Sequence, residues 1–230
     1  MSLFVIADLH LSLSANKPMD VFHGWSDYVE RLKTNWDNIV KPDDVVVIAG
    51  DISWAMKLED TYEDFKFINE RPGKKLFMKG NHDYWWTTKN KMVSYLKEKG
   101  FDTIEIVHNS AYIHEDVGVC GTRGWIHPAW DNFKEEDRKI FEREVIRLEL
   151  SLQSVGECEE RYVFTHYPPI SLQQEGNAFR DMMKKYDVTK CFYGHLHAAA
   201  HANAFNGSAD GIEYKLVAAD YLRFEPYLIK

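Results

Sequence analysis

One stretch of the sequence is especially informative about the fold: residues 45–51 read Val-Val-Val-Ile-Ala-Gly-Asp. An uninterrupted apolar run, mostly of β-branched residues, predicts a strand that is buried on both of its faces. Gly50 and Asp51 follow at the point where this strand would end. Because side chains at the carboxyl ends of strands in an α/β sheet line a common crevice, Asp51 is a candidate functional residue.

Four more motifs place polar side chains directly after a short apolar run, at residues 3–7, 76–78, 162–164 and 191–193. Carboxylate, amide and imidazole groups are ligands for divalent metal ions with open coordination positions. Two aspartates, one asparagine and four histidines are more ligands than one ion needs, so the sequence predicts a site for two ions and chemistry on phosphate. With Gly50-Asp51, the full set is Asp8-Leu9-His10, Gly80-Asn81-His82-Asp83, His166 and Gly194-His195-Leu196-His197.

The remaining pattern predicts helices and further strands around these motifs. Helical spacing of apolar residues indicates helices at 25–40, 58–70, 87–99, 134–155 and 177–186, with Gly100 ending the third. The segments 103–107, 111–114 and 117–121 favour a β-meander on a second sheet, and 212–219 and 227–230 favour closing strands. We therefore expect two sheets flanked by helices, in a single domain spanning residues 1–230.

The motif set, which runs from Asp8 to His197, resembles that of the calcineurin-like metallophosphoesterase superfamily. Every metal-ligand position of the family pattern is matched, and the tryptophan-rich segments are similar to a bacterial cytosolic branch. The resemblance implies a four-layer αββα sandwich with two mixed sheets. It also implies one ion held by Asp8, His10, Asp51 and His197, and a second held by Asp51, Asn81, His166 and His195. Asp51 would bridge the two ions, with manganese favoured over iron, zinc or magnesium.

The same resemblance suggests how catalysis would proceed. A hydroxide shared by the two metals would attack phosphorus in line with the leaving oxygen. His82 resembles the catalytic histidine of the family, and it would protonate or stabilise the leaving oxygen. We expect Asp83 to hydrogen-bond the His82 imidazole and favour its protonated form. The alternative for Asp83 is an ordinary loop cap.

Three further residues are candidates for substrate contacts. Arg123 lies in the glycine-flanked loop 121–124, where a guanidinium could clamp a phosphate or form a salt bridge. Trp54 and Trp125 lie near the motifs and could line a pocket or pack in the core. For Trp36, and for at least one of Trp85 and Trp86, we expect the core.

Composition narrows the function further. The chain has 28 Lys and Arg against 36 Asp and Glu, a formal charge of −8, and shows no long basic stripe. This balance favours a small phosphorylated substrate, such as a nucleotide or a diester, over a nuclease. A non-catalytic metal-binding scaffold is the other alternative, but the presence of His82 and of every ligand weighs against it. The same ligands fit hydrolysis of a phosphomonoester, a phosphodiester or a pyrophosphate, and the sequence does not choose among them.

The cysteine pattern and the amino terminus bear on location. The three cysteines are Cys120, Cys158 and Cys191; none belongs to a Cys-x-x-Cys pair, so we expect no disulfides and a reducing cytoplasm. No signal peptide and no membrane-spanning apolar run is visible. We therefore expect a cytoplasmic protein with no membrane partner, and the sequence makes no prediction of oligomeric state.

Overall fold

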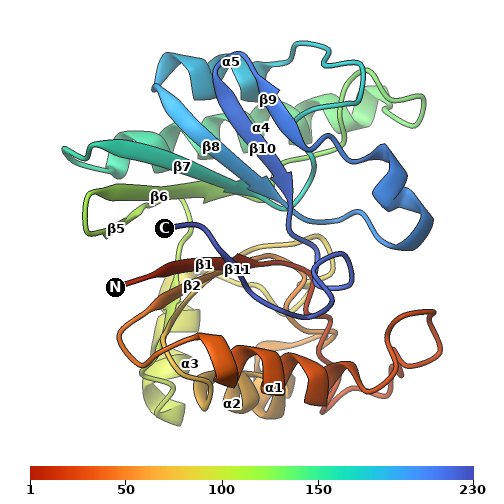
Figure 1. The fold of residues 1–230 in the computed structure, drawn as a ribbon, viewed down its shortest axis with the longest axis vertical. Helices are drawn as coiled ribbons and strands as arrows, with labels where there is room; N and C mark the ends of the chain where they lie inside the picture. Colours follow the sequence, from red (N-terminus) through yellow and green to blue (C-terminus); the bar gives the residue numbers. More distant parts are fainter.

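The computed structural model describes residues 1–230 as two β-sheets packed face to face (Figure 1). The first sheet has the strand order β11-β1-β2-β3-β4. Its strands β1 to β4 are parallel to their neighbours, and β11 pairs antiparallel with β1. The bounds are β1 Leu3–Ile6, β2 Val45–Ala49, β3 Lys74–Met78, β4 Ile104–Ile106 and β11 Tyr227–Leu228.

The second sheet has the strand order β5-β6-β7-β8-β10-β9. Its four central strands are parallel, and the edge strands β5 and β9 run antiparallel to their neighbours. Both sheets are therefore mixed, as expected. The bounds are β5 Tyr112–His114, β6 Val117–Thr122, β7 Glu160–Thr165, β8 Val188–Tyr193, β9 Gly207–Ala209 and β10 Ile212–Leu216.

Helices cover the outer face of each sheet and complete four layers (Figure 1). Helices α1 (Tyr28–Ile39), α2 (Tyr62–Asn69) and α3 (Lys89–Lys99) lie on the first sheet. Helices α4 (Glu135–Ser154) and α5 (Ala178–Lys185) lie on the second. Two short 3₁₀ helices, η1 (Leu58–Thr61) and η2 (Ala198–Asn203), lie in connections. The predicted αββα sandwich is thus confirmed.

Three apolar layers hold the sandwich together. One fills the space between the sheets and includes Val47, Leu76 and Phe164, all of which are inaccessible to solvent. Each of the other two layers lies between one sheet and the helices that cover it. Because each central strand contributes side chains to two layers, its sequence is continuously apolar rather than alternating. Trp36 and Trp85 are buried in the helix-side core, which confirms their expected role.

The predicted β-meander is wrong in one respect. Strand β4 belongs to the first sheet, where it lies parallel to β3. Since β4 follows helix α3, it completes another strand–helix–strand unit, and only β5 and β6 form an antiparallel hairpin in the second sheet. A strand of three residues carries too little pattern to identify its partner, so the sequence alone could not separate these arrangements.

Several helix bounds also differ from those expected. Helix α1 begins at Tyr28, after a turn in which Asp27 has a left-handed φ of 51°. The helix expected at 58–70 is divided into η1 and α2. Gly100 ends α3 in the left-handed conformation, as predicted. All three cysteines are free, and none of the helices has the length and apolar character needed to cross a bilayer.

Candidate metal centre

The strand ends of both sheets bring the predicted ligands to one place. Asp8 follows β1, Asp51 follows β2 and Asn81 follows β3, all in the first sheet. His166 follows β7, and the loop of His195 and His197 follows β8, in the second sheet. Residues from distant parts of the chain thus converge because parallel strands end at the same edge of a sheet.

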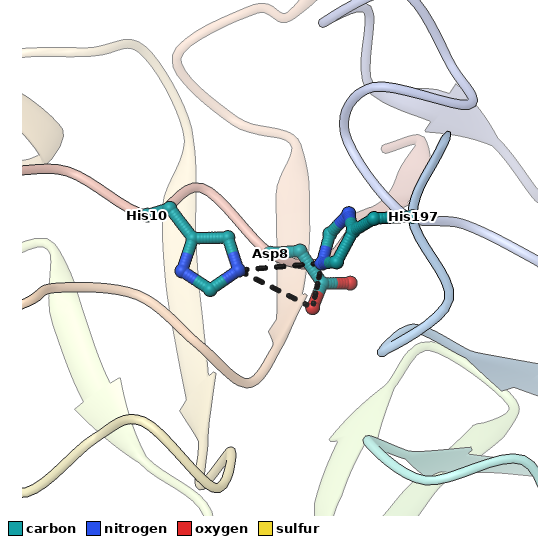
Figure 2. Close-up of side chains that lie close together, drawn as sticks. All are labelled: Asp8, His10 and His197. Carbon is teal, nitrogen blue, oxygen red and sulfur yellow. Dashed lines mark hydrogen bonds and ion pairs between the residues drawn. The ribbon is translucent and has the colours of Figure 1, made fainter. Parts of the chain in front are cut away.

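The side chains of Asp8, His10 and His197 form the first group of candidate ligands (Figure 2). His197 Nε2 lies 3.3 Å from Asp8 Oδ1 and 3.3 Å from His10 Nε2. His10 Nε2 lies 4.0 Å from Asp8 Oδ1. Two ligands of one ion with bonds of about 2.0–2.2 Å are separated by roughly 3–4 Å, so this spacing suits a shared cation.

A second group of ligand atoms lies beside the first. His166 Nε2 is 2.7 Å from Asn81 Oδ1 and 3.3 Å from Asp51 Oδ2. His195 Nδ1 lies 3.0 Å from Asn81 Oδ1 and 3.3 Å from His166 Nε2. Asp51 Oδ2 also lies 3.7 Å from His10 Nε2 of the first group. The Asp51 carboxylate therefore stands between the two groups.

Two histidines are oriented by hydrogen-bond partners on Nδ1. His166 Nδ1 lies 3.3 Å from the carbonyl oxygen of Ala49, and His197 Nδ1 lies 2.9 Å from Asp220 Oδ1. Such partners hold a proton on Nδ1 and leave the Nε2 lone pair free for a metal. Sequence analysis missed Asp220, although it follows the apolar residues 216–219 after β10, just as the candidate ligands follow their strands.

The residues present fit a bound cation. The Nε2 atoms of His10 and His197 face each other at 3.3 Å, and the buried Nδ1 of His10 has no hydrogen-bond partner. Two imidazole nitrogens this close need a positive charge between them, either a shared proton or a metal ion. A divalent ion resolves this arrangement, because each nitrogen then donates its lone pair to the ion.

The backbone at the centre is strained. Asp8, His10, Asp51 and His195 all have a positive φ, between 46° and 74°. Residues other than glycine rarely adopt this conformation, and such strain concentrates at functional sites. Two glycines permit the close approach of the loops: a Cβ on Gly80 would lie 2.1 Å from Asp51 Oδ1, and one on Gly194 would lie 2.2 Å from Asp8 Oδ2.

Electrostatics set the protonation of the ligands. Burial lowers the pKa of His10 to about 4, and burial together with His166 lowers the pKa of His195 to about 3. Burial would raise the pKa of Asp51, but the charges of His166 and His10 overcome it and hold that pKa well below its usual range. Near neutral pH, the imidazoles of His10 and His195 are therefore uncharged and the Asp51 carboxyl is ionised, as metal binding requires.

His197 behaves differently from these two histidines. Burial opposes its protonation, but Asp8 and Asp220 outweigh burial and raise the pKa of His197 to about 10. A metal ion bound to Nε2 must therefore displace a proton, so binding at the first group releases protons to solvent.

The expected hydrogen bond between Asp83 and the His82 imidazole is not formed. Asp83 is fully buried and accepts hydrogen bonds from the backbone N–H groups of Asp51, Ile52 and Gly80 and from Trp85 Nε1, at 2.7–3.0 Å. Burial and the nearby Asp51 raise the pKa of Asp83 to about 7. Asp83 thus ties the loops after β2 and β3 together, which is closer to the loop-cap alternative.

His82 itself lies at the edge of the centre. Its backbone N–H donates to Asp51 Oδ1 at 2.7 Å, and its ring is half-buried. Burial lowers the pKa of His82, so the ring is not held in the protonated form that was expected. The nearest partner of its Nδ1 is the Tyr84 hydroxyl, at 3.5 Å.

The three candidate substrate residues lie in different surroundings. Trp54 stacks on His10 with ring centroids 4.8 Å apart and lies 4.5 Å from His82, so it lines the centre. Trp125 donates to Asp137 and packs on Tyr167, and the Tyr167 ring separates it from His195.

Arg123 forms the salt bridge that was its alternative role. Its Nη2 lies 3.2 Å from the buried Glu144 carboxylate, which also binds Arg147 at 2.7 Å. No hydrogen bond or ion pair joins the Arg123 side chain to a ligand residue. The phosphate clamp expected of Arg123 therefore has no support in this geometry.

The fold and the candidate ligands at its strand ends point to a metallophosphoesterase. Residues 1–199 match the family described as calcineurin-like phosphoesterase, and the chain belongs to that family. No curated protein matches the chain significantly.

Solved structures with the same fold share little sequence with this chain. One is AQ665 from Aquifex aeolicus, a protein of unknown function, with 20% identity and a TM-score of 0.52 over 99% of this chain and 95% of the other. Another is phosphopantetheinyl hydrolase (PptH) from Mycobacterium tuberculosis, with 14% identity and a TM-score of 0.58 over the same shares. TT1561 from Thermus thermophilus has 11% identity and a TM-score of 0.50 over 85% and 81%. At these identities the likeness concerns the fold alone.

Proposed function

We propose that the protein hydrolyses phosphate esters of small molecules, using two divalent ions bridged by Asp51. The observation that carries this proposal is the position of Asp51 Oδ2, 3.7 Å from His10 Nε2 in one ligand group and 3.3 Å from His166 Nε2 in the other. When bound, two such ions would polarise the phosphoryl group and lower the pKa of coordinated water. Manganese is the ion we would supply first.

The chain's own residues would fix the geometry of the reaction. Asp51 and Asp8 provide buried negative charge, which would offset the charge of the bound cations. Asp220 and the Ala49 carbonyl keep His197 and His166 in the orientation that metal binding needs. Asp83 hydrogen-bonds the loops after β2 and β3 to each other. The ligand side chains are therefore positioned before the substrate binds, and they would need little reorganisation during the reaction.

His82 is the proposed proton donor for the leaving oxygen. Its ring is half-buried beside the two ligand groups, with its centroid 5.7 Å from that of His10. An ester oxygen that departs on this side would lie within reach of the imidazole, which would protonate it or donate a hydrogen bond to it.

Small substrates are favoured over nucleic acid and over a scaffold role. The formal charge of −8 disfavours extended contact with a phosphate backbone. The presence of both ligand groups and of His82 supports a catalytic role over a scaffold role. We propose that the protein acts in the cytoplasm, on a nucleotide or another small phosphate ester.

The experiment that tests this function uses metal-stripped protein with Mn²⁺ added back. Its substrates are p-nitrophenyl phosphate and bis-p-nitrophenyl phosphate, followed by mononucleotides, dinucleotides and phosphopantetheine, which is included because of the hydrolase of related fold. Manganese-dependent release of p-nitrophenol is expected, and the preferred ester identifies a monoesterase or a diesterase. No turnover of any ester by protein that has bound metal would contradict the proposal and favour a scaffold.

A further inference from the structure

The loop that follows β1 carries a lysine to the mouth of the metal centre. Leu13 N donates to Asp64 Oδ1 at 2.8 Å, and the buried Met19 places its sulfur 3.2 Å from Trp54 Nε1. Between these two anchors, Lys17 Nζ lies 3.0 Å from the centroid of the Trp54 ring. The ammonium group is therefore held against an aromatic face rather than extended into solvent.

Trp54 places this lysine beside the catalytic groups. The Trp54 ring stacks on the ligand His10 and lies 4.5 Å from the ring of His82. One aromatic ring thus separates the Lys17 ammonium from the side of the centre where the leaving group would depart.

The charge of Lys17 has no anionic partner. Lys17 is exposed and forms no ion pair, in contrast to Arg123, whose guanidinium is bound to Glu144. A cation–π contact at an exposed site is weak, whereas an ammonium ion binds a carboxylate or phosphate through a stronger charge-assisted hydrogen bond. Since the lysine side chain is flexible, Nζ can leave the ring when an anion is offered nearby.

We propose that Lys17 binds a second anionic group, a carboxylate or a further phosphate, on the leaving-group part of the substrate. This inference rests on the proposed phosphoesterase function. The reacting phosphoryl group is the one that the ligand groups and their ions would bind. The Lys17 ammonium, one Trp54 ring away from His10 and His82, is therefore free for an anion beyond it. Substrate preference would then depend on a residue outside the sequence motifs.

The test compares two esters that differ by one carboxylate: the phenyl and 3-carboxyphenyl esters of whichever series, monoester or diester, the manganese-loaded protein hydrolyses. Wild type is expected to prefer the 3-carboxyphenyl ester. Lys17→Met should lower that preference about tenfold, as expected for loss of one charge-assisted hydrogen bond, and Lys17→Arg should retain most of it. Lys41→Met is the matched control, because Lys41 is exposed and precedes β2, at the end of the strand opposite to the metal centre.

Calorimetric titration with phenylphosphonate and 3-carboxyphenylphosphonate measures the same preference without turnover. The inference is overturned if Lys17→Met leaves the preference unchanged, if it weakens both compounds equally, or if Lys41→Met has the same effect. Absence of hydrolysis by the wild type would instead reject the proposed function, and the phosphonate titration would still decide the role of Lys17.

Discussion

The Nδ1 atom of His197 lies 2.9 Å from the carboxylate of Asp220. Asp220 lies in the turn that follows β10, and its side chain is nearly buried. The same carboxylate accepts a hydrogen bond from the backbone N–H of Ala198. Asp220 therefore fixes the ring orientation of His197 and the backbone directly after it, without being a ligand. A carboxylate in this position also makes the imidazole a stronger metal ligand.

Replacement of Asp220 by asparagine should weaken metal binding at the group of Asp8, His10 and His197. We expect the affinity for Mn²⁺ to fall about 10- to 100-fold, because the amide neither holds the Nδ1 proton as strongly nor raises the basicity of the ring. Titration calorimetry measures this change. Asp43→Asn is the control, since Asp43 is exposed and lies before β2, away from the centre. Equal affinities for wild type and Asp220→Asn would show that the contact is incidental.

His82→Ala should slow hydrolysis while metal content stays normal. We expect kcat to fall by about 10²- to 10⁴-fold for esters of poor leaving groups, and by less for p-nitrophenyl esters, whose leaving oxygen needs little protonation. Rates for a series of phenyl esters measure the dependence on leaving-group pKa. If the loss is the same across the series, His82 does not act on the leaving oxygen.

Sequence patterns could predict the strands and the convergence of the candidate ligands, because each motif follows an apolar run and that information is local. The partners of the polar side chains could not be predicted in the same way. Asp83 was expected to contact the neighbouring His82, but its carboxylate accepts hydrogen bonds from backbone N–H groups of the loop after β2. Arg123 was a candidate for phosphate, but the buried Glu144 of α4 balances its charge.

The order of the strands could not be fully predicted for the same reason. Strand β4 joins the first sheet through long-range pairing with β3, and three residues do not specify that partner. Lys17 carries no motif at all, and its position depends on how the loop after β1 folds back on Trp54. In each case, the missing information concerns contacts between residues that are distant in sequence.

Asp83→Ala should destabilise the protein as well as inactivate it. Removing the carboxylate leaves buried N–H groups of Asp51, Ile52 and Gly80 without an acceptor, at a cost of about 1–3 kcal/mol for each unsatisfied group. We expect the free energy of unfolding, measured by urea denaturation in chelator, to fall by about 3 kcal/mol or more. His82→Ala should change it by less than about 0.5 kcal/mol. A stable Asp83→Ala protein with the kinetic defect of His82→Ala would restore Asp83 as a partner of the imidazole.

Lys75, which is not part of the metal centre, should make the folding stability of the protein depend on pH. Its buried ammonium donates to the carbonyl oxygens of Arg71 and Asn69, and burial, followed by the charge of Arg71, lowers its pKa from 10.5 to about 7. Between these two values the unfolded chain binds the proton and the folded chain does not, so stability should rise with pH. The slope is at most about 1.4 kcal/mol per pH unit.

Denaturation of wild type and Lys75→Met at several pH values tests this expectation. The difference in unfolding free energy should shift in favour of wild type as the pH increases from about 7 towards about 10. The exposed Lys41→Met, compared with wild type in the same way, should show no such trend. A difference that stays constant with pH would mean that Lys75 remains protonated in the folded protein.

The central claim is that Asp51 joins two metal ions, and anomalous X-ray diffraction at the manganese edge from Mn²⁺-soaked crystals tests it most directly. Two peaks about 3.5–4 Å apart are expected, with an Asp51 oxygen between them, one peak near His10 and His197 and the other near His166 and His195. A single peak at full occupancy under saturating Mn²⁺, or two peaks of which one lacks Asp51 as a ligand, would contradict the account.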